Sequence, residues 1–216
     1  MLRIYGEGSK MKFFDPLTHL EINEINQEIA LAEKQTSAEI VPVLVEKLKN
    51  NEISTLKISL HFLFGLQVMI LLTVILFLNE EYSYPGLLLV LILVCIKFLI
   101  KKKMKSIERF SAQKEAEEEF LAQGIGETIG SNGVLLFIAL KNRQVVILAD
   151  HDLNDSQSDE KWVSVIQHFQ ESMKDQNLKE AIKNSIKELG ILCKEIYPKT
   201  LSDTNEIKNE IRIKKS

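Results

Sequence analysis

Cysteine, proline and tryptophan are scarce in this chain of 216 residues, which contains two, four and one of them respectively. Cys95 falls in an apolar run and Cys193 in a late amphipathic segment, so a disulfide framework is excluded. The chain also lacks an internal repeat, a low-complexity tract and a large basic field, and its net charge is -3. These absences argue against nucleic acid as a partner. The polar first twelve residues do not resemble a signal peptide.

Two long apolar runs interrupt this otherwise ordinary composition, at residues 58–78 and 82–100. A helix of roughly 20 apolar residues is long enough to cross the hydrocarbon core of a bilayer, which is about 30 Å thick. Because only a few residues separate the runs, we expect a transmembrane helical hairpin over residues 57–100. Both flanking segments would then lie on the same side of the membrane.

Charges around the two runs predict the orientation of this hairpin. Glu80 and Glu81 lie in the short connection, whereas Lys101, Lys102 and Lys103 follow the second run. Lys and Arg concentrate in short cytoplasmic flanks of membrane helices. We therefore expect a multi-pass protein of the bacterial inner membrane, in contact with the lipid bilayer, with its soluble domain and both termini in the cytoplasm.

The rest of the sequence predicts one discontinuous domain over residues 13–200, built from residues 13–56 and 101–200. Helical spacing of apolar residues and buried-strand patterns alternate along it. The predicted helices cover residues 15–35, 105–123, 162–173 and 178–196, and the predicted strands cover residues 38–45, 134–140 and 144–149. This order indicates the α/β class, as an α/β/α sandwich around a small mixed sheet. The polar residues 201–216 are expected to be a disordered tail.

Several of these segments resemble the TPM domain family. Residues 132–140 and 143–150 are similar to its central hairpin, residues 38–41 to its first strand, and residues 186–198 to the closing helix of its bacterial membrane-protein branch. The resemblance implies an α/β/α sandwich. It also implies either a proposed acid-phosphatase activity with calcium binding or an accessory role in a membrane complex, with a LemA-like membrane protein as a possible partner.

An acidic stretch after the last predicted strand is the best candidate for chemistry. Asp150, Asp152 and Asp155 supply the oxygen ligands that Ca²⁺ or Mg²⁺ prefers, and Glu39 could face them from the end of the sheet. The EF-hand spacing is absent, and aspartates also turn chains and cap helices. Glu39 could instead reach solvent at the mouth of its strand or pair with a lysine. His151 could act as an acid or base, or simply lie on a polar loop.

The sequence contains no complete set of catalytic residues to act with these carboxylates. The four histidines are scattered, and the glycines between residues 124 and 130 follow a helix, unlike those of a dinucleotide-binding loop. We therefore expect a non-catalytic binding or accessory module for a membrane protein complex. The alternative is a divalent-cation-dependent phosphatase in which the aspartates hold the cation.

Overall fold

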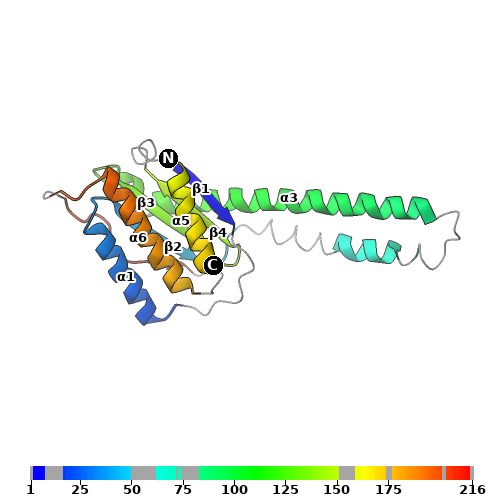
Figure 1. Cartoon of the computed structure of the whole chain (residues 1–216), viewed down its shortest axis with the longest axis horizontal. Coiled ribbons are helices and arrows are strands. Elements are labelled where there is room, and N and C mark those ends of the chain that lie inside the picture. Colours follow the sequence, from blue (N-terminus) through cyan, green and yellow to red (C-terminus); the bar gives the residue numbers. More distant parts are fainter. Residues whose placement is uncertain are drawn as a thin grey trace. The chain divides into compact units, whose positions relative to one another are not determined.

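The computed structural model describes residues 2–7, 17–49, 62–71, 73, 83–150, 159–173, 177–200 and 203–214. The chain forms two compact units. The first comprises Met1–Lys49 and Ser111–Ser216, and the second comprises Asn50–Phe110. Segments on both sides of the second unit therefore fold together in the first, whose helices and strands are labelled in Figure 1.

A five-stranded mixed sheet lies at the centre of the first unit. Its strands are β1 (Leu2–Glu7), β2 (Glu39–Val45), β3 (Gly133–Ala139), β4 (Gln144–Ala149) and β5 (Arg212–Lys214). They lie in the order β1-β4-β3-β2-β5. Strand β2 runs parallel to β3 and β5, whereas β4 runs antiparallel to β3 and β1. The predicted α/β fold with a small mixed sheet is thus confirmed.

Three helices cover one face of this sheet: α1 (His19–Glu33), α5 (Asp159–Ser172) and α6 (Leu178–Ile196) (Figure 1). Their apolar stripes pack against inward-facing strand residues in one cluster that includes Ile29, Leu136, Trp162 and Ile182. Helix α1 begins after Thr18, which forms a capping box with Glu21. The predicted start of this helix at residue 15 lies outside the described residues.

The opposite face of the sheet packs against α3 (Ser83–Ala122) and the short 3-10 helix η2 (Ile125–Glu127). Ala112, Ala116 and Phe120 of α3 join Phe137 of β3 in a second core cluster. Within the described residues, the first unit is therefore built in three layers, with the sheet in the middle.

The expected membrane hairpin is corrected by the structure. Among the described residues, we find no helix with both the length and the apolar character that crossing a bilayer requires. This finding contradicts the expected localisation as a multi-pass protein of the inner membrane.

Residues 203–214 also differ from the expectation of a disordered tail. Arg212–Lys214 form β5 and pair with Val43–Val45 of β2. Ile211 is 7% exposed and belongs to the core cluster on the face of α1. This segment has few apolar residues and is mostly polar, so its own sequence does not predict a strand. It forms one because it pairs with β2, which is far away in the chain.

Candidate functional site

Glu39 lies at the first position of β2 and is almost completely buried, with 3% of its surface exposed. Its Oε1 accepts a hydrogen bond from the backbone N–H of Glu206 at 3.0 Å, and its Oε2 accepts one from that of Ile207 at 3.2 Å. Burial raises the pKa of this carboxyl, and the two backbone N–H groups partly oppose that effect. Glu39 is therefore held by main-chain donors.

Glu33, the last residue of α1, is a second buried carboxyl beside the same strand, with 6% of its surface exposed. Its Oε1 accepts a hydrogen bond from Ile40 N–H at 2.9 Å, and its Oε2 accepts one from the side-chain amide of Asn209. Burial raises the pKa of Glu33 to about 8, to which the neighbouring Glu39 also contributes. Glu33 is therefore mostly protonated at neutral pH.

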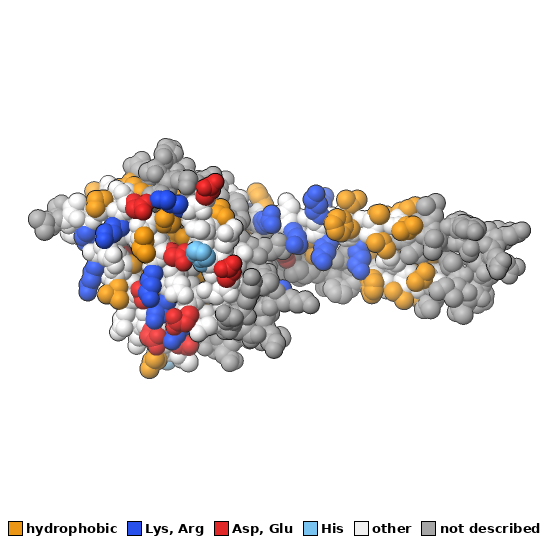
Figure 2. Space-filling model, in the orientation of Figure 1, with side chains coloured by type: hydrophobic (Ala, Val, Ile, Leu, Met, Phe, Trp, Pro, Cys, Tyr) orange, Lys and Arg blue, Asp and Glu red, His pale blue; other side chains and the backbone are white. Residues whose placement is uncertain are grey.

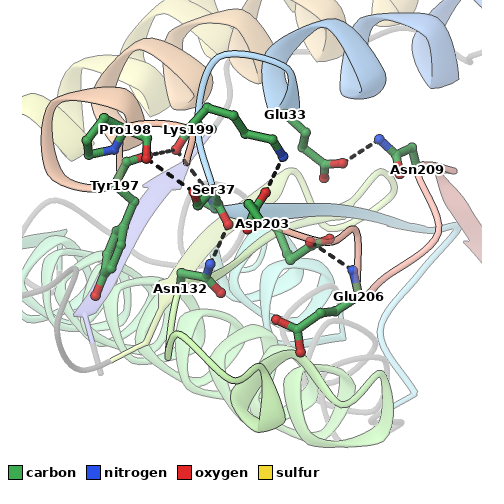
Figure 3. A network of polar contacts seen from close by, with 12 residues as sticks. Glu33, Ser37, Asn132, Tyr197, Pro198, Lys199, Asp203, Glu206 and Asn209 are labelled. Atoms are coloured by element: carbon green, nitrogen blue, oxygen red, sulfur yellow. Dashed lines mark hydrogen bonds and ion pairs between the residues drawn. The ribbon is translucent and has the colours of Figure 1, made fainter. Parts of the chain in front are cut away.

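Figure 3 shows polar side chains around Glu33. The side-chain amide of Asn132 donates to the backbone oxygen of Ser37, and Lys199 pairs with Asp203. The Asn132 backbone oxygen accepts a hydrogen bond from Glu39 N–H at 3.2 Å. This network joins the start of β2, the loop before β3 and the segment after α6. It fastens chain segments that are far apart in sequence.

The carboxylate geometry favours a structural role over catalysis. Each of the four carboxylate oxygens of Glu33 and Glu39 accepts a hydrogen bond from the chain itself. A catalytic carboxylate needs an oxygen within hydrogen-bond reach of its substrate. Here each of those oxygens already accepts one hydrogen bond, from Ile40 or from residues 206–209.

The structure describes only part of the predicted metal site. Asp150 follows β4, and its N–H donates to the backbone oxygen of Gly133, the residue that is paired with Glu39. Asp150 and Glu39 therefore lie at the same end of the sheet. Asp152, Asp155 and His151 lie outside the described residues. Within the described part of the chain, no cluster of three or more His, Cys, Asp or Glu side chains could hold a metal. The Ca²⁺ or Mg²⁺ site stays a prediction.

Sequence reasoning missed Glu33 and Asn209. The signal for Glu33 was present, because Ile25, Ile29 and Glu33 follow one another at steps of four residues on the buried side of α1. A carboxyl on an apolar stripe requires a partner when it is buried. That partner, Asn209, lies 176 residues further along the chain.

A second candidate site is the exposed apolar surface of the second unit. Helical residues 62–71 and the first described turns of α3 present large hydrophobic side chains to solvent: Phe62, Phe64, Leu66, Val68, Met69, Leu71, Leu91, Ile92, Val94, Ile96, Phe98 and Leu99. Figure 2 shows hydrophobic side chains gathered over this part of α3. The ammonium group of Lys97 lies 3.8 Å from the centre of the Phe64 ring, a cation–π contact. Contiguous exposed apolar surface of this kind marks interaction sites.

Comparisons with known proteins relate part of the chain to the TPM domain. The sequence profile of the TPM domain matches residues 92–191. The NMR structure of the BA42 protein from the psychrophilic bacterium Bizionia argentinensis sp. nov. has a similar fold, with a TM-score of 0.61 and 21% sequence identity. That match covers 94% of this chain and 99% of BA42. No curated protein matches the sequence.

Proposed function

We propose that this chain, part of which matches the TPM domain, is a binding or accessory module rather than a catalyst. The observation that supports the proposal is the exposed apolar surface of residues 62–71 and 91–99. Phe62 and Phe98 are 75% and 70% exposed, and neither contributes to the sheet core. Burying such side chains against a partner is favourable by roughly 25 cal/mol per Å² of apolar area.

The partner that best fits this surface is a membrane protein, and a LemA-like protein is our specific proposal. Its apolar side chains would cover the exposed phenylalanines and leucines, while Lys101, Lys102 and Lys103, just beyond the surface, would pair with acidic groups at the rim. The lipid bilayer is the competing occupant, because basic residues beside an apolar surface also suit anionic headgroups.

Capture from native membranes tests the proposal. We expect the tagged wild-type chain to retain a specific companion protein and the Phe98→Asp variant to lose it. Ile129→Asp is the matched control, because Ile129 is 91% exposed and lies outside this surface. Retention of the companion by Phe98→Asp would contradict the assigned surface. If the purified chain binds protein-free anionic vesicles and floats with them, the apolar surface is a lipid-binding surface instead.

A divalent-cation-dependent phosphatase is the alternative function, and the shared sheet end of Glu39 and Asp150 favours it. The cation would be held by Asp150, Asp152 and Asp155. Hydrolysis of a phosphate monoester that requires Ca²⁺ or Mg²⁺, and that is lost in Asp152→Ala, would support this alternative and overturn the non-catalytic proposal. Unchanged thermal stability on adding either cation, together with no cation-dependent rate, would contradict the alternative.

A further inference from the structure

The helical residues 62–71 and the part of α3 at residues 91–100, which we call the helix pair, each carry one row of less exposed side chains. Successive residues of a helix are about 100° apart, so positions i, i+4 and i+7 form a row along its surface. We call the less exposed row of each helix its inner row. The inner rows consist of Leu63, Gln67 and Ile70 in the first helix and of Leu93, Lys97 and Ile100 in α3.

Apolar and exposed rows flank the inner row on both sides in each helix. In the first helix these flanking rows consist of Phe62, Leu66 and Met69 on one side and of Phe64, Val68 and Leu71 on the other. In α3 they consist of Leu91, Val94 and Phe98 on one side and of Ile92, Ile96 and Leu99 on the other. The exposed apolar surface of the second unit is therefore two-sided.

The polar side chains of the helix pair lie in its inner rows. Gln67 and Lys97 are the only strongly polar residues of these two segments. Gln67 is 9% exposed, and the Lys97 ammonium group lies over the Phe64 ring, as described above. Helices packed together in water place their apolar side chains inward and their polar side chains outward. Here that arrangement is reversed, so the helix pair suits surroundings that are apolar on both sides.

Side-chain spacing and charge indicate what supplies these surroundings. Rows at helical spacing are the ridges that pack into the grooves of other helices. Lys101, Lys102 and Lys103 follow the apolar rows of α3 directly, and all three are exposed. A partner that covers the rows therefore needs acidic side chains at this level. A second copy of the chain aligned in the same direction would instead bring lysines against lysines.

We propose that the companion membrane protein encloses the helix pair between apolar helices that lie on both of its sides. This inference rests on the proposed function and specifies the partner further. A partner with a single groove would cover one flanking row of each helix and leave the other in water. Helices on both sides bury all four flanking rows, while acidic side chains at their ends pair with the lysines.

Thiol labelling of the captured complex tests the proposal. The chain has two cysteines, and Cys193 is buried, so full-length Cys95→Ser is a background for a single exposed thiol. Leu66→Cys and Val68→Cys each place that thiol in a different flanking row. A maleimide should label both at least about tenfold more slowly in the complex than after removal of the companion, because only uncovered chain reacts. Ile129→Cys, the matched control, should react equally in both.

The pattern of protection decides between the possible occupants. Protection of one row alone would overturn the proposal and leave the proposed function intact, because the companion would then cover one side only. Equal protection of both rows with and without the companion would also overturn it, by assigning the cover to lipid or to a second copy of the chain. If no companion is captured at all, the proposed function and this inference both fail.

Capture of the companion gives an independent readout. Leu66→Asp and Val68→Asp should each reduce the amount of retained companion at least about tenfold, because each places an unpaired carboxylate in an apolar contact on a different side. Circular dichroism establishes that each variant keeps the helix content of the wild type, and the labelling experiment does not depend on an added charge. Full retention of the companion by either variant would overturn the proposal.

Discussion

Glu33 and Glu39 are alike in type and burial, but they accept hydrogen bonds from different kinds of donor. Both donors to Glu39 are backbone N–H groups, which cannot change orientation. One donor to Glu33 is backbone, whereas the other is the side-chain amide of Asn209, which can rotate to present its oxygen instead. Replacement of glutamate by glutamine should therefore have different consequences at the two positions.

Glu39→Gln should destabilise the domain. Replacing one carboxylate oxygen with an NH₂ group places a donor against the N–H of Glu206 or Ile207, so a buried hydrogen bond is lost. The expected loss is about 1–3 kcal/mol in the free energy of unfolding, measured by chemical denaturation near neutral pH. If Glu39→Gln had the same free energy of unfolding as the wild type, the hydrogen bonds from these backbone N–H groups to Glu39 would not contribute to stability.

Glu33→Gln should instead flatten the dependence of stability on pH. The pKa of Glu33 rises from 4.5 to about 8 on folding, so between these values the folded state keeps a proton that the unfolded state has lost. The free energy of unfolding therefore falls as pH rises through this interval, by up to about 5 kcal/mol. Glutamine stays neutral at every pH and can still bond to Ile40 N–H and to a rotated Asn209.

Denaturation of the wild type and Glu33→Gln at several pH values between about 5 and 9 measures this contribution, because each unit of pKa shift corresponds to about 1.4 kcal/mol. The two proteins should differ most in slope between pH 4.5 and 8, with the variant losing less stability as the pH rises. Parallel curves would show that Glu33 does not keep its proton in the folded state.

At the scale of the elements, β3 requires a glycine at its start. A methyl group on Gly133 would lie 2.2 Å from the backbone oxygen of Ile125 in η2. That oxygen belongs to main chain and cannot move as a flexible side chain could. Gly133→Ala should therefore push η2 away from the sheet and destabilise the domain by about 2 kcal/mol or more.

Gly65→Ala is the matched control for this substitution, because nothing lies within 4 Å of a methyl group added there. Thermal unfolding should separate the two variants clearly, because alanine in place of a helical glycine should leave the control unchanged or stabilise it by up to about 1 kcal/mol. A wild-type melting temperature in Gly133→Ala would contradict the close approach of η2 to β3.

The elements differ in how far their sequences reveal them. Strands β3 and β4 are continuous apolar runs joined by a tight turn at residues 141–143, and the sequence predicted both within a residue or two. Strands β1 and β5 escaped prediction because their polar segments gain their pairing from β4 and β2, far away in the chain. Glu39 was predicted to face the aspartates, to reach solvent or to pair with a lysine, because its actual partners, the N–H groups of Glu206 and Ile207, depend on that same distant pairing.

At the scale of the whole molecule, one sheet is assembled from segments that flank the second unit. Strand β2 precedes residues 50–110 and β3 follows them, yet the two strands pair in register along seven residues. The points where the chain leaves and re-enters the first unit are close to each other. Lys49 N–H donates to Glu115 Oε2 at 2.9 Å, and Leu48 packs in the same core cluster as Ala112. The second unit is therefore inserted between two neighbouring strands of one sheet.

Replacement of residues 50–110 by a flexible linker of about eight Gly and Ser residues should leave the first unit folded. Such a linker reaches about 15 Å on average. Ser111 lies four residues, or about 6 Å along α3, from Glu115, so the linker is long enough. We expect a single cooperative thermal transition by circular dichroism. The shortened chain lacks the apolar surface, so we expect that it no longer retains the companion protein in the capture experiment. Loss of the cooperative transition would show that the sheet depends on the insertion.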